Sequence, residues 1–148
     1  MPGRRGPVLL RSALMGVLIG IDLAEVERVA GVLTRTGERF LARVFLPEEI
    51  HRGRRHPRAF AEHVAGRFAA KEAAMKALGT GWRGLSFKEI SIGREPTGKP
   101  RLIFLGRALE RARQLGVVSA EVSITHTAVT AAAAVILVTE DPPRPETP

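Results

Sequence analysis

The fold is decided by residues 58–78, which read RAFAEHVAGRFAAKEAAMKAL and are followed by Gly79. At about 100° per residue, the rotation of an α-helix, large apolar side chains share one side of this segment and small ones share another. The large residues are Phe60, Val64, Phe68, Met75 and Leu78, and the small ones are Gly66, Ala69, Ala70, Ala73 and Ala77. A helix that is apolar on two sides packs against neighbours on both, so we expect a long central helix that ends at Gly79.

Four charged residues interrupt this apolar pattern: Arg67, Lys71, Glu72 and Lys76. Lys71 falls inside the large apolar stripe, where an unpaired ion would cost several kcal/mol of desolvation. In one interpretation, Glu72 and Lys76 form a surface i,i+4 pair while Lys71 extends its ammonium to solvent. In the other, the four side chains line a polar cleft between this helix and another element.

Asp22 is the natural partner for Glu72 in such a cleft. It follows the apolar run of residues 14–21 and is the only aspartate within residues 15–139. Strand ends are common ligand sites, and Mg²⁺ typically takes one or two carboxylates together with phosphate oxygens. We therefore expect Asp22 and Glu72 to hold a divalent cation at a phosphate site. The alternative role for Asp22 is to cap the N-terminus of the helix that follows it.

The remaining segments predict strands and shorter helices around the central helix. We expect a first strand over residues 16–23, a helix that begins near Val26 and ends at Gly37, a short helix over 38–45 and a turn at 47–49. Strands over 86–92 and 101–105, a helix ended by Gly116, and a hairpin of strands over 120–125 and 130–138 follow. The predicted fold class is α+β: an antiparallel sheet with the long central helix packed against it.

One domain is expected, over residues 15–139. Residues 1–14 are predicted to be an N-terminal extension that is disordered or lies upstream of the true start, because Met15 would serve as a start codon. Alternatively, their arginines and the apolar run that follows form a targeting signal, although no small-residue cleavage site is present. Residues 140–148 hold four prolines and are predicted to be a disordered tail.

Charge and composition narrow the function. The 23 Lys and Arg against 15 Asp and Glu give a net charge of +8, which predicts a polyanionic partner: nucleic acid, a phosphorylated cofactor or an acidic protein. An aromatic content of only 5% argues against stacking on single-stranded nucleic acid, although a nucleic-acid binder is the second hypothesis. The chain has no cysteine, so thiolate chemistry is excluded, and no apolar run is long enough to cross a membrane.

Three segments together resemble one family. They are residues 19–28 (IGIDLAEVER), residues 66–73 (GRFAAKEA) with Gly79-Thr80-Gly81 behind them, and residues 123–127 (SITHT). In this order and spacing they are similar to the motifs of holo-(acyl-carrier-protein) synthases, the short trimeric type of 4′-phosphopantetheinyl transferase. The resemblance implies the fold of that family and a cytoplasmic role in fatty-acid biosynthesis. A relative that has lost catalysis is a third hypothesis, which the intact set of Asp22, Glu72 and Lys76 argues against.

The resemblance implies a reaction and a role for each matched residue. Coenzyme A is the donor, a serine hydroxyl of an apo acyl-carrier protein attacks its β-phosphate, and adenosine 3′,5′-bisphosphate leaves. The residues matching Asp22 and Glu72 hold Mg²⁺, and Lys76 matches a lysine that approaches the pyrophosphate and assists the leaving group. Either a water on the metal or a carboxylate takes the serine proton.

The resemblance also implies binding surfaces. Arg67, Lys71, Gly79, Gly81 and His126 match positions near the coenzyme, although His126 could instead be a turn histidine bonded to neighbouring backbone. The basic residues Arg28, Arg39 and Arg43 match a patch that docks the acidic carrier protein, their alternative being a solvated helix face. Active sites lie between the protomers of a homotrimer, and neither nucleic acid nor a membrane is an expected partner. Thr97 stands in the turn 95–100 where asparagine is more usual, and Gly98 supplies the difficult backbone angle there.

Overall fold

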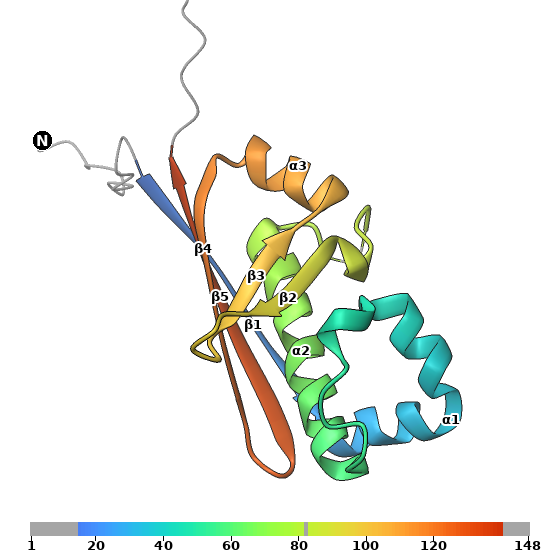
Figure 1. The fold of residues 1–148 in the computed structure, drawn as a ribbon. Coiled ribbons are helices and arrows are strands. Elements are labelled where there is room, and N and C mark those ends of the chain that lie inside the picture. Colours follow the sequence, from blue (N-terminus) through green and yellow to red (C-terminus); the bar gives the residue numbers. More distant parts are fainter. Residues whose placement is uncertain (1–14, 82, 141–148) are drawn as a thin grey trace, which may run out of the picture.

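The computed structural model describes residues 15–81 and 83–140, so the predicted extension 1–14 and the tail beyond Glu140 lie outside the described residues. The described residues form three α-helices and two antiparallel sheets, which confirms the predicted α+β class. Figure 1 shows how these elements are arranged. The strands are β1 (Met15–Glu25), β2 (Ile90–Arg94), β3 (Pro100–Phe104), β4 (Val117–His126) and β5 (Thr130–Glu140). The helices are α1 (Val26–Val44), α2 (Pro57–Leu78) and α3 (Gly106–Gln114), with 3₁₀ turns η1 (Pro47–Glu49) and η2 (Phe87–Glu89).

The larger sheet has the order β1-β5-β4, and α2 packs along β1 and β5 (Figure 1). The run of alanines in β5 favours helix by intrinsic propensity, yet it forms the central strand as predicted, because the strand is paired on both edges. The residues of β5 that face α2 include two small ones, Ala131 and Ala133, which are buried. The small face of α2 therefore lies close to the sheet, as the two-sided apolar pattern predicted.

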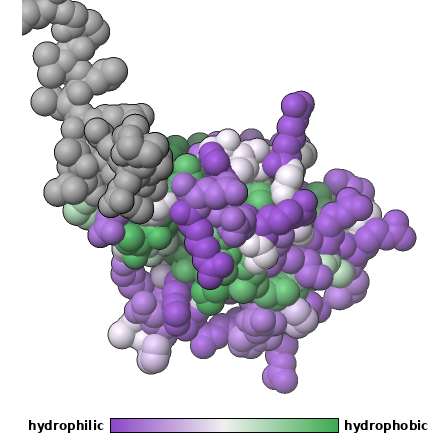
Figure 2. Space-filling view, turned by 90° about the horizontal axis from the view of Figure 1, so that it is seen from above, coloured by the Kyte–Doolittle hydropathy of each residue, from purple (hydrophilic) through white to green (hydrophobic). Residues whose placement is uncertain are grey.

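Strand β1 is an edge strand with two different faces. Its residues alternate across the sheet, so Gly20, Asp22 and Ala24 face α2 while the residues between them face outward. The outward residues are Met15, Val17, Ile19, Ile21 and Leu23, each more than half exposed. Apolar groups also reach the surface between charged side chains on the face seen from above (Figure 2).

Two predicted boundaries differ from the structure. The two helices expected on either side of Gly37 form one element, α1, which is bent at the non-helical Thr36 (φ −137°, ψ 24°). The strand expected from residue 86 begins only at Ile90, because Ser86 and Glu89 cap the 3₁₀ turn η2 with reciprocal hydrogen bonds. In the described part of the chain, no helix is both long and apolar enough to span a membrane.

Candidate active site

Asp22, Glu72 and Lys76 come together where β1 crosses α2, as predicted. Lys76 Nζ donates to Asp22 Oδ1 at 2.8 Å and to the Ile21 carbonyl oxygen at 3.0 Å. The ion pair of Lys76 is therefore with the strand rather than the i,i+4 pair with Glu72 that one interpretation proposed. Asp22 does not cap α1 either, because Glu25 is the N-cap residue and no side chain accepts a bond there.

The carboxyl group of Glu72 has an unusual affinity for protons. Its pKa is raised to about 7, first by partial burial and then by the neighbouring Asp22 carboxylate, which lies within hydrogen-bonding reach. Lys76 and Arg28 offset only part of this effect. Two carboxyl groups are thus held close enough that the pair favours either a shared proton or a cation.

One carboxylate oxygen of Asp22 shows whether these residues fit a bound cation. Its Oδ2 is buried and has no hydrogen-bond partner among the described groups, which is rare for a carboxylate oxygen in a folded protein. An unpartnered carboxylate oxygen beside a second carboxyl group fits a hard divalent cation such as Mg²⁺. Within residues 15–81 and 83–140, no cluster of three or more His, Cys, Asp or Glu side chains could hold a metal. Asp22 and Glu72 are thus the two carboxylates that could hold such an ion, with water and substrate at its other positions.

A cavity of about 570 Å³ opens beside Glu72. Its apolar wall comes from α1 and α2 through Val29, Val32, Phe40 and Phe68, and Arg28 is its basic group. Arg28, matched by resemblance to the docking patch, thus lies in the same cavity as a proposed metal ligand. An extended organic chain could lie along the apolar wall with its charged end at Glu72.

A second cavity, of about 380 Å³, holds Arg67 and His126 and is lined by different residues from the cavity of Glu72. Burial is the main cause that lowers the pKa of Arg67 to about 10, and Arg94 adds to it. His63 also lines this cavity, and its pKa is lowered to about 4 by burial and by Arg67, so it is neutral at pH 7. The cavity is therefore basic and suited to an anion.

His126 lies at the end of β4, at the rim of the second cavity. Its Nδ1 is 3.3 Å from the Thr127 carbonyl oxygen and 3.8 Å from Glu62 Oε2. The backbone contact is the one that the turn-histidine alternative anticipated. Because the side chain is about half exposed, it can still reach a ligand in the cavity.

Lys71 is placed differently from both interpretations of the sequence. Its side chain is fully buried, and Nζ donates to Glu49 Oε2 (2.9 Å), Val44 O (2.8 Å) and Phe87 O (3.1 Å). All three protons of the ammonium are thus used inside the protein, so Lys71 neither reaches solvent nor lines a cleft. The expected place of Lys71 beside the coenzyme phosphates is therefore corrected. The helical periodicity showed that a charge at this position is unusual, but it could not identify the acceptors around it.

Glu49 is the residue that the sequence interpretation missed. Its carboxylate accepts from Lys71, from the amide of Leu46 at 2.7 Å and from the amide of Ile92 at 2.8 Å. Its carbonyl oxygen accepts from Arg67 Nε at 3.1 Å. An acidic residue two positions after Pro47 is typical of an exposed first turn, and only the out-of-pattern Lys71 hinted that a buried carboxylate was needed.

The other predicted residues lie at element ends or on the surface. Gly79 ends α2 with a positive φ of 73°, and Gly81 follows with φ 55°, so both have backbone angles that favour glycine. Arg28, Arg39 and Arg43 are exposed on α1, as expected for a docking patch and equally for a solvated face.

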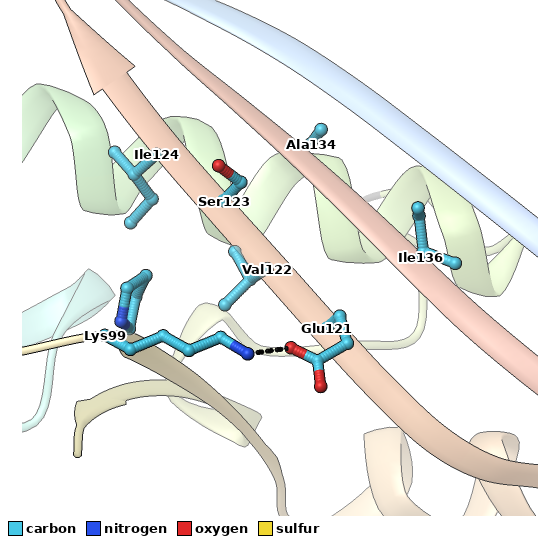
Figure 3. A pocket seen from close by; sticks show the side chains of 8 residues that line it. Lys99, Glu121, Val122, Ser123, Ile124, Ala134 and Ile136 are labelled. Atoms are coloured by element: carbon cyan, nitrogen blue, oxygen red, sulfur yellow. Dashed lines mark hydrogen bonds and ion pairs between the residues drawn. The ribbon is translucent and has the colours of Figure 1, made fainter. Parts of the chain in front are cut away.

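A third cavity, of about 310 Å³, lies on the outer side of β4 and contains none of the predicted site residues. Figure 3 shows Lys99 from the turn between β2 and β3 extended toward Glu121 on β4. Their ion pair spans 2.7 Å, and both side chains are at least half exposed. The rest of the lining is mostly apolar and includes Ile124 and Ile136.

The fold, a long helix packed on an antiparallel sheet, was compared with known proteins. The family model of the 4′-phosphopantetheinyl transferase superfamily matches residues 18–133, and the chain belongs to this family. It is 47% identical over 119 residues to the holo-[acyl-carrier-protein] synthase of Koribacter versatilis, an alignment that covers 80% of this chain and 94% of the relative.

Solved structures agree with the sequence comparison. The holo-ACP-synthase of Plasmodium yoelii superposes with a TM-score of 0.74 at 28% identity, covering 86% of this chain and 98% of that one. The Helicobacter pylori holo-[acyl-carrier-protein] synthase in complex with coenzyme A gives 0.71 at 32% identity, covering 81% and 99%. The resemblance to holo-(acyl-carrier-protein) synthases that the three motifs carried is thereby confirmed.

Proposed function

We propose that this chain transfers 4′-phosphopantetheine from coenzyme A to a serine of an apo acyl-carrier protein, with Mg²⁺ held by Asp22 and Glu72. The serine oxygen forms a bond to the β-phosphorus, the bond from that phosphorus to the bridging oxygen breaks, and adenosine 3′,5′-bisphosphate leaves. The serine proton passes to a base. We place the reaction in fatty-acid biosynthesis, in the cytoplasm.

The observation that carries the Mg²⁺ proposal is the buried, unpartnered Oδ2 of Asp22 next to the Glu72 carboxyl group. Asp22 and Glu72 would be the two protein ligands. When bound, the ion neutralises negative charge that develops on the phosphoryl oxygens.

The chain's own side chains supply the remaining steps. Lys76 is more than half exposed, and Asp22 and the Ile21 carbonyl hold its ammonium in place, so it can donate a proton or a hydrogen bond to the leaving oxygen. The apolar wall of Phe40 and Phe68 accommodates the pantetheine arm and excludes water from the reacting phosphorus.

We infer that the coenzyme phosphates lie against Arg67 and His126, with Gly79 and Gly81 near the end of the same helix as Lys76. Arg67 and His126 line a different cavity from Glu72, so a complete site needs the second cavity of a neighbouring copy. The outward apolar row of β1, with Ile19 69% exposed, supplies a surface for that contact. We therefore propose a homotrimer with shared active sites.

We also propose that Arg28, Arg39 and Arg43 dock the acidic carrier protein. They are exposed on α1, the helix that forms one wall of the cavity beside Glu72. A carrier bound there would bring its serine to the carboxylate pair, and attraction between opposite charges would speed the encounter.

Mass spectrometry of an apo acyl-carrier protein incubated with coenzyme A and Mg²⁺ tests the reaction. We expect a gain of one phosphopantetheine, which is lost when a chelator is added. Asp22→Asn and Glu72→Gln should each abolish transfer in a folded protein, whereas Glu110→Gln on α3 should not change it. Normal transfer by both site variants would contradict the Mg²⁺ proposal, and salt-dependent DNA binding without coenzyme A binding would favour the nucleic-acid hypothesis.

A further inference from the structure

Strand β1 and helix α2 touch at Gly20. A Cβ atom built there would lie 2.8 Å from the Ala77 amide nitrogen and closer still to the Ala73 carbonyl oxygen. Both are backbone atoms in the last two turns of α2 and, unlike the end of a side chain, cannot rotate away. Any side chain at this position would therefore push the strand and the helix apart.

The contact lies between the groups of the carboxylate site. On the strand, Asp22 is the next residue that faces α2 after Gly20. On the helix, Glu72 directly precedes Ala73 and Lys76 directly precedes Ala77. The hydrogen bond from the Lys76 ammonium to the Ile21 carbonyl oxygen links the helix to the strand at the same point.

We infer that Gly20 is a positioning residue for the divalent-cation site: its missing side chain sets the separation of β1 and α2 at which Asp22 and Glu72 reach one ion. The inference rests on the proposed function, because it takes these two carboxylates as the metal ligands. An aspartate has a single methylene between backbone and carboxylate, so it follows a movement of its strand with little freedom to compensate. Losing a group that orients a metal ligand typically weakens metal affinity by about 10–100-fold, and a shift of the strand that carries Asp22 disturbs the orientation of that ligand in the same way.

The same strand offers a matched control. Gly16 faces the same side of β1, four residues earlier, and a Cβ there would meet only the Thr139 hydroxyl oxygen, at 2.7 Å. That hydroxyl belongs to a side chain that can rotate. Gly16→Ala therefore adds the same methyl group to the same strand without separating it from α2.

The test measures binding of Mn²⁺ in the presence of coenzyme A by electron paramagnetic resonance, together with kcat and the KM for the carrier protein. We expect Gly20→Ala to weaken Mn²⁺ binding about 10-fold or more and to lower kcat, with the KM for the carrier unchanged because α1 is not altered. Gly16→Ala should bind Mn²⁺ as the parent does. A variant that is only less stable would bind fewer Mn²⁺ ions in total, but its folded molecules would keep the Mn²⁺ affinity of the parent. Leu102→Ala, in the buried part of β3, is the control variant for this case.

Lengthening the carboxylate gives a second test that leaves the backbone contact intact. In the parent, Asp22→Glu should weaken Mn²⁺ binding because the spacing suits the shorter side chain. In Gly20→Ala, the same change should restore part of the lost affinity, because a longer side chain spans the wider gap.

The outcomes separate the inference from the proposed function. Parent-like Mn²⁺ affinity in Gly20→Ala or in Asp22→Glu overturns the positioning role of Gly20. Parent-like affinity in Asp22→Asn and Glu72→Gln overturns the metal site itself, whatever Gly20→Ala does.

Discussion

The raised pKa of Glu72 follows from two groups that no single segment contains. Burial against α1 and the Asp22 carboxylate from β1 both disfavour the ionised form. A carboxyl group with a pKa near 7 is costly to ionise unless a cation is present. Protons and divalent cations should therefore compete for this residue near neutral pH.

This competition predicts how stability depends on pH in protein free of divalent ions. The folded state binds the Glu72 proton more tightly than the unfolded chain does, because the pKa rises from 4.5 to about 7 on folding. The free energy of unfolding contributed by Glu72 should therefore fall as pH rises from about 4.5 to about 7. Urea denaturation across this range should show the free energy of unfolding of the parent falling relative to that of Glu72→Gln, whereas the lowered pKa of His63 makes stability rise with pH in both proteins. The difference between the two isolates Glu72, because groups such as His63 titrate alike in both.

The ion pair of Lys71 and Glu49 is the second case in which distant segments decide a residue's role. Three acceptors surround the ammonium, and the Phe45 ring lies 4.9 Å from Nζ. A buried ion whose bonds are all satisfied holds its neighbours in one arrangement. Lys71 therefore joins α2 to the end of α1, to η1 and to η2.

Lys71→Met should destabilise the protein by about 3–5 kcal/mol, because it leaves the Glu49 carboxylate buried without its counter-ion. Lys99→Met is the matched control, since Lys99 forms a short ion pair with Glu121 that is exposed to solvent. Urea titrations of the two variants should differ clearly, with no measurable change for Lys99→Met. A similar small change in both would show that the buried pair contributes little.

For single residues, the sequence predicted which side chains are unusual better than it predicted which groups those side chains contact. Asp22 and Glu72 were found because each stood out, one as an aspartate in a chain that otherwise uses glutamate and the other as an acid on an apolar helix. Lys71 stood out for the same reason and was assigned to the wrong surroundings. The pattern along a helix shows that a buried charge needs a partner, but the partner, Glu49, is 22 residues away.

Among the elements, helices and strands were predicted well because their apolar periods are local. The interruption expected at Gly37 falls one residue earlier, at the kink of Thr36 inside α1. The late start of β2 was not predicted, because it depends on reciprocal caps over only a few residues. The packing of α2 on the sheet follows from its small face, whose alanines meet the alanines of β5. The pattern of small residues along α2 therefore predicted that this helix packs on the sheet. The distance between α2 and β1 depends on Gly20.

The basic face of α1 predicts a binding effect without a catalytic one. Arg39→Glu should raise the KM for the acyl-carrier protein about 10-fold or more and leave kcat nearly unchanged, because it adds repulsion at a docking surface. Arg113→Glu makes the same charge change on the exposed side of α3 and should have little effect. Steady-state kinetics at two salt concentrations would check this, and an unchanged KM for Arg39→Glu would remove α1 from the docking surface.

For the whole molecule, the apolar outer face of β1 has the properties of an interface. Five large side chains on an edge strand are each more than half exposed, and no part of the chain within residues 15–81 and 83–140 covers them. The strand that carries Asp22 on its inner face therefore carries the proposed assembly surface on its outer face.

Ile19→Asp should convert the proposed trimer to monomers and reduce transfer, because a charge would be buried in the contact. Sedimentation velocity would report the size, and circular dichroism would report whether the monomer stays folded. Leu105→Asp, at a part-exposed apolar position just before α3, should leave the size unchanged. A parent protein that sediments as a monomer at micromolar concentration would contradict the trimer.

The two-faced strand has a consequence for how this chain tolerates insertions and deletions. Side chains alternate along β1, so a slip of one position relative to β5 would turn Ile21 toward Glu72 and Asp22 toward solvent. Catalysis and self-association would fail in a single event, even if every other part of the chain kept its shape. A single-residue insertion within β1 would keep both faces in place only if a bulge absorbed it, as the irregularity between Val117 and Ser119 does in β4.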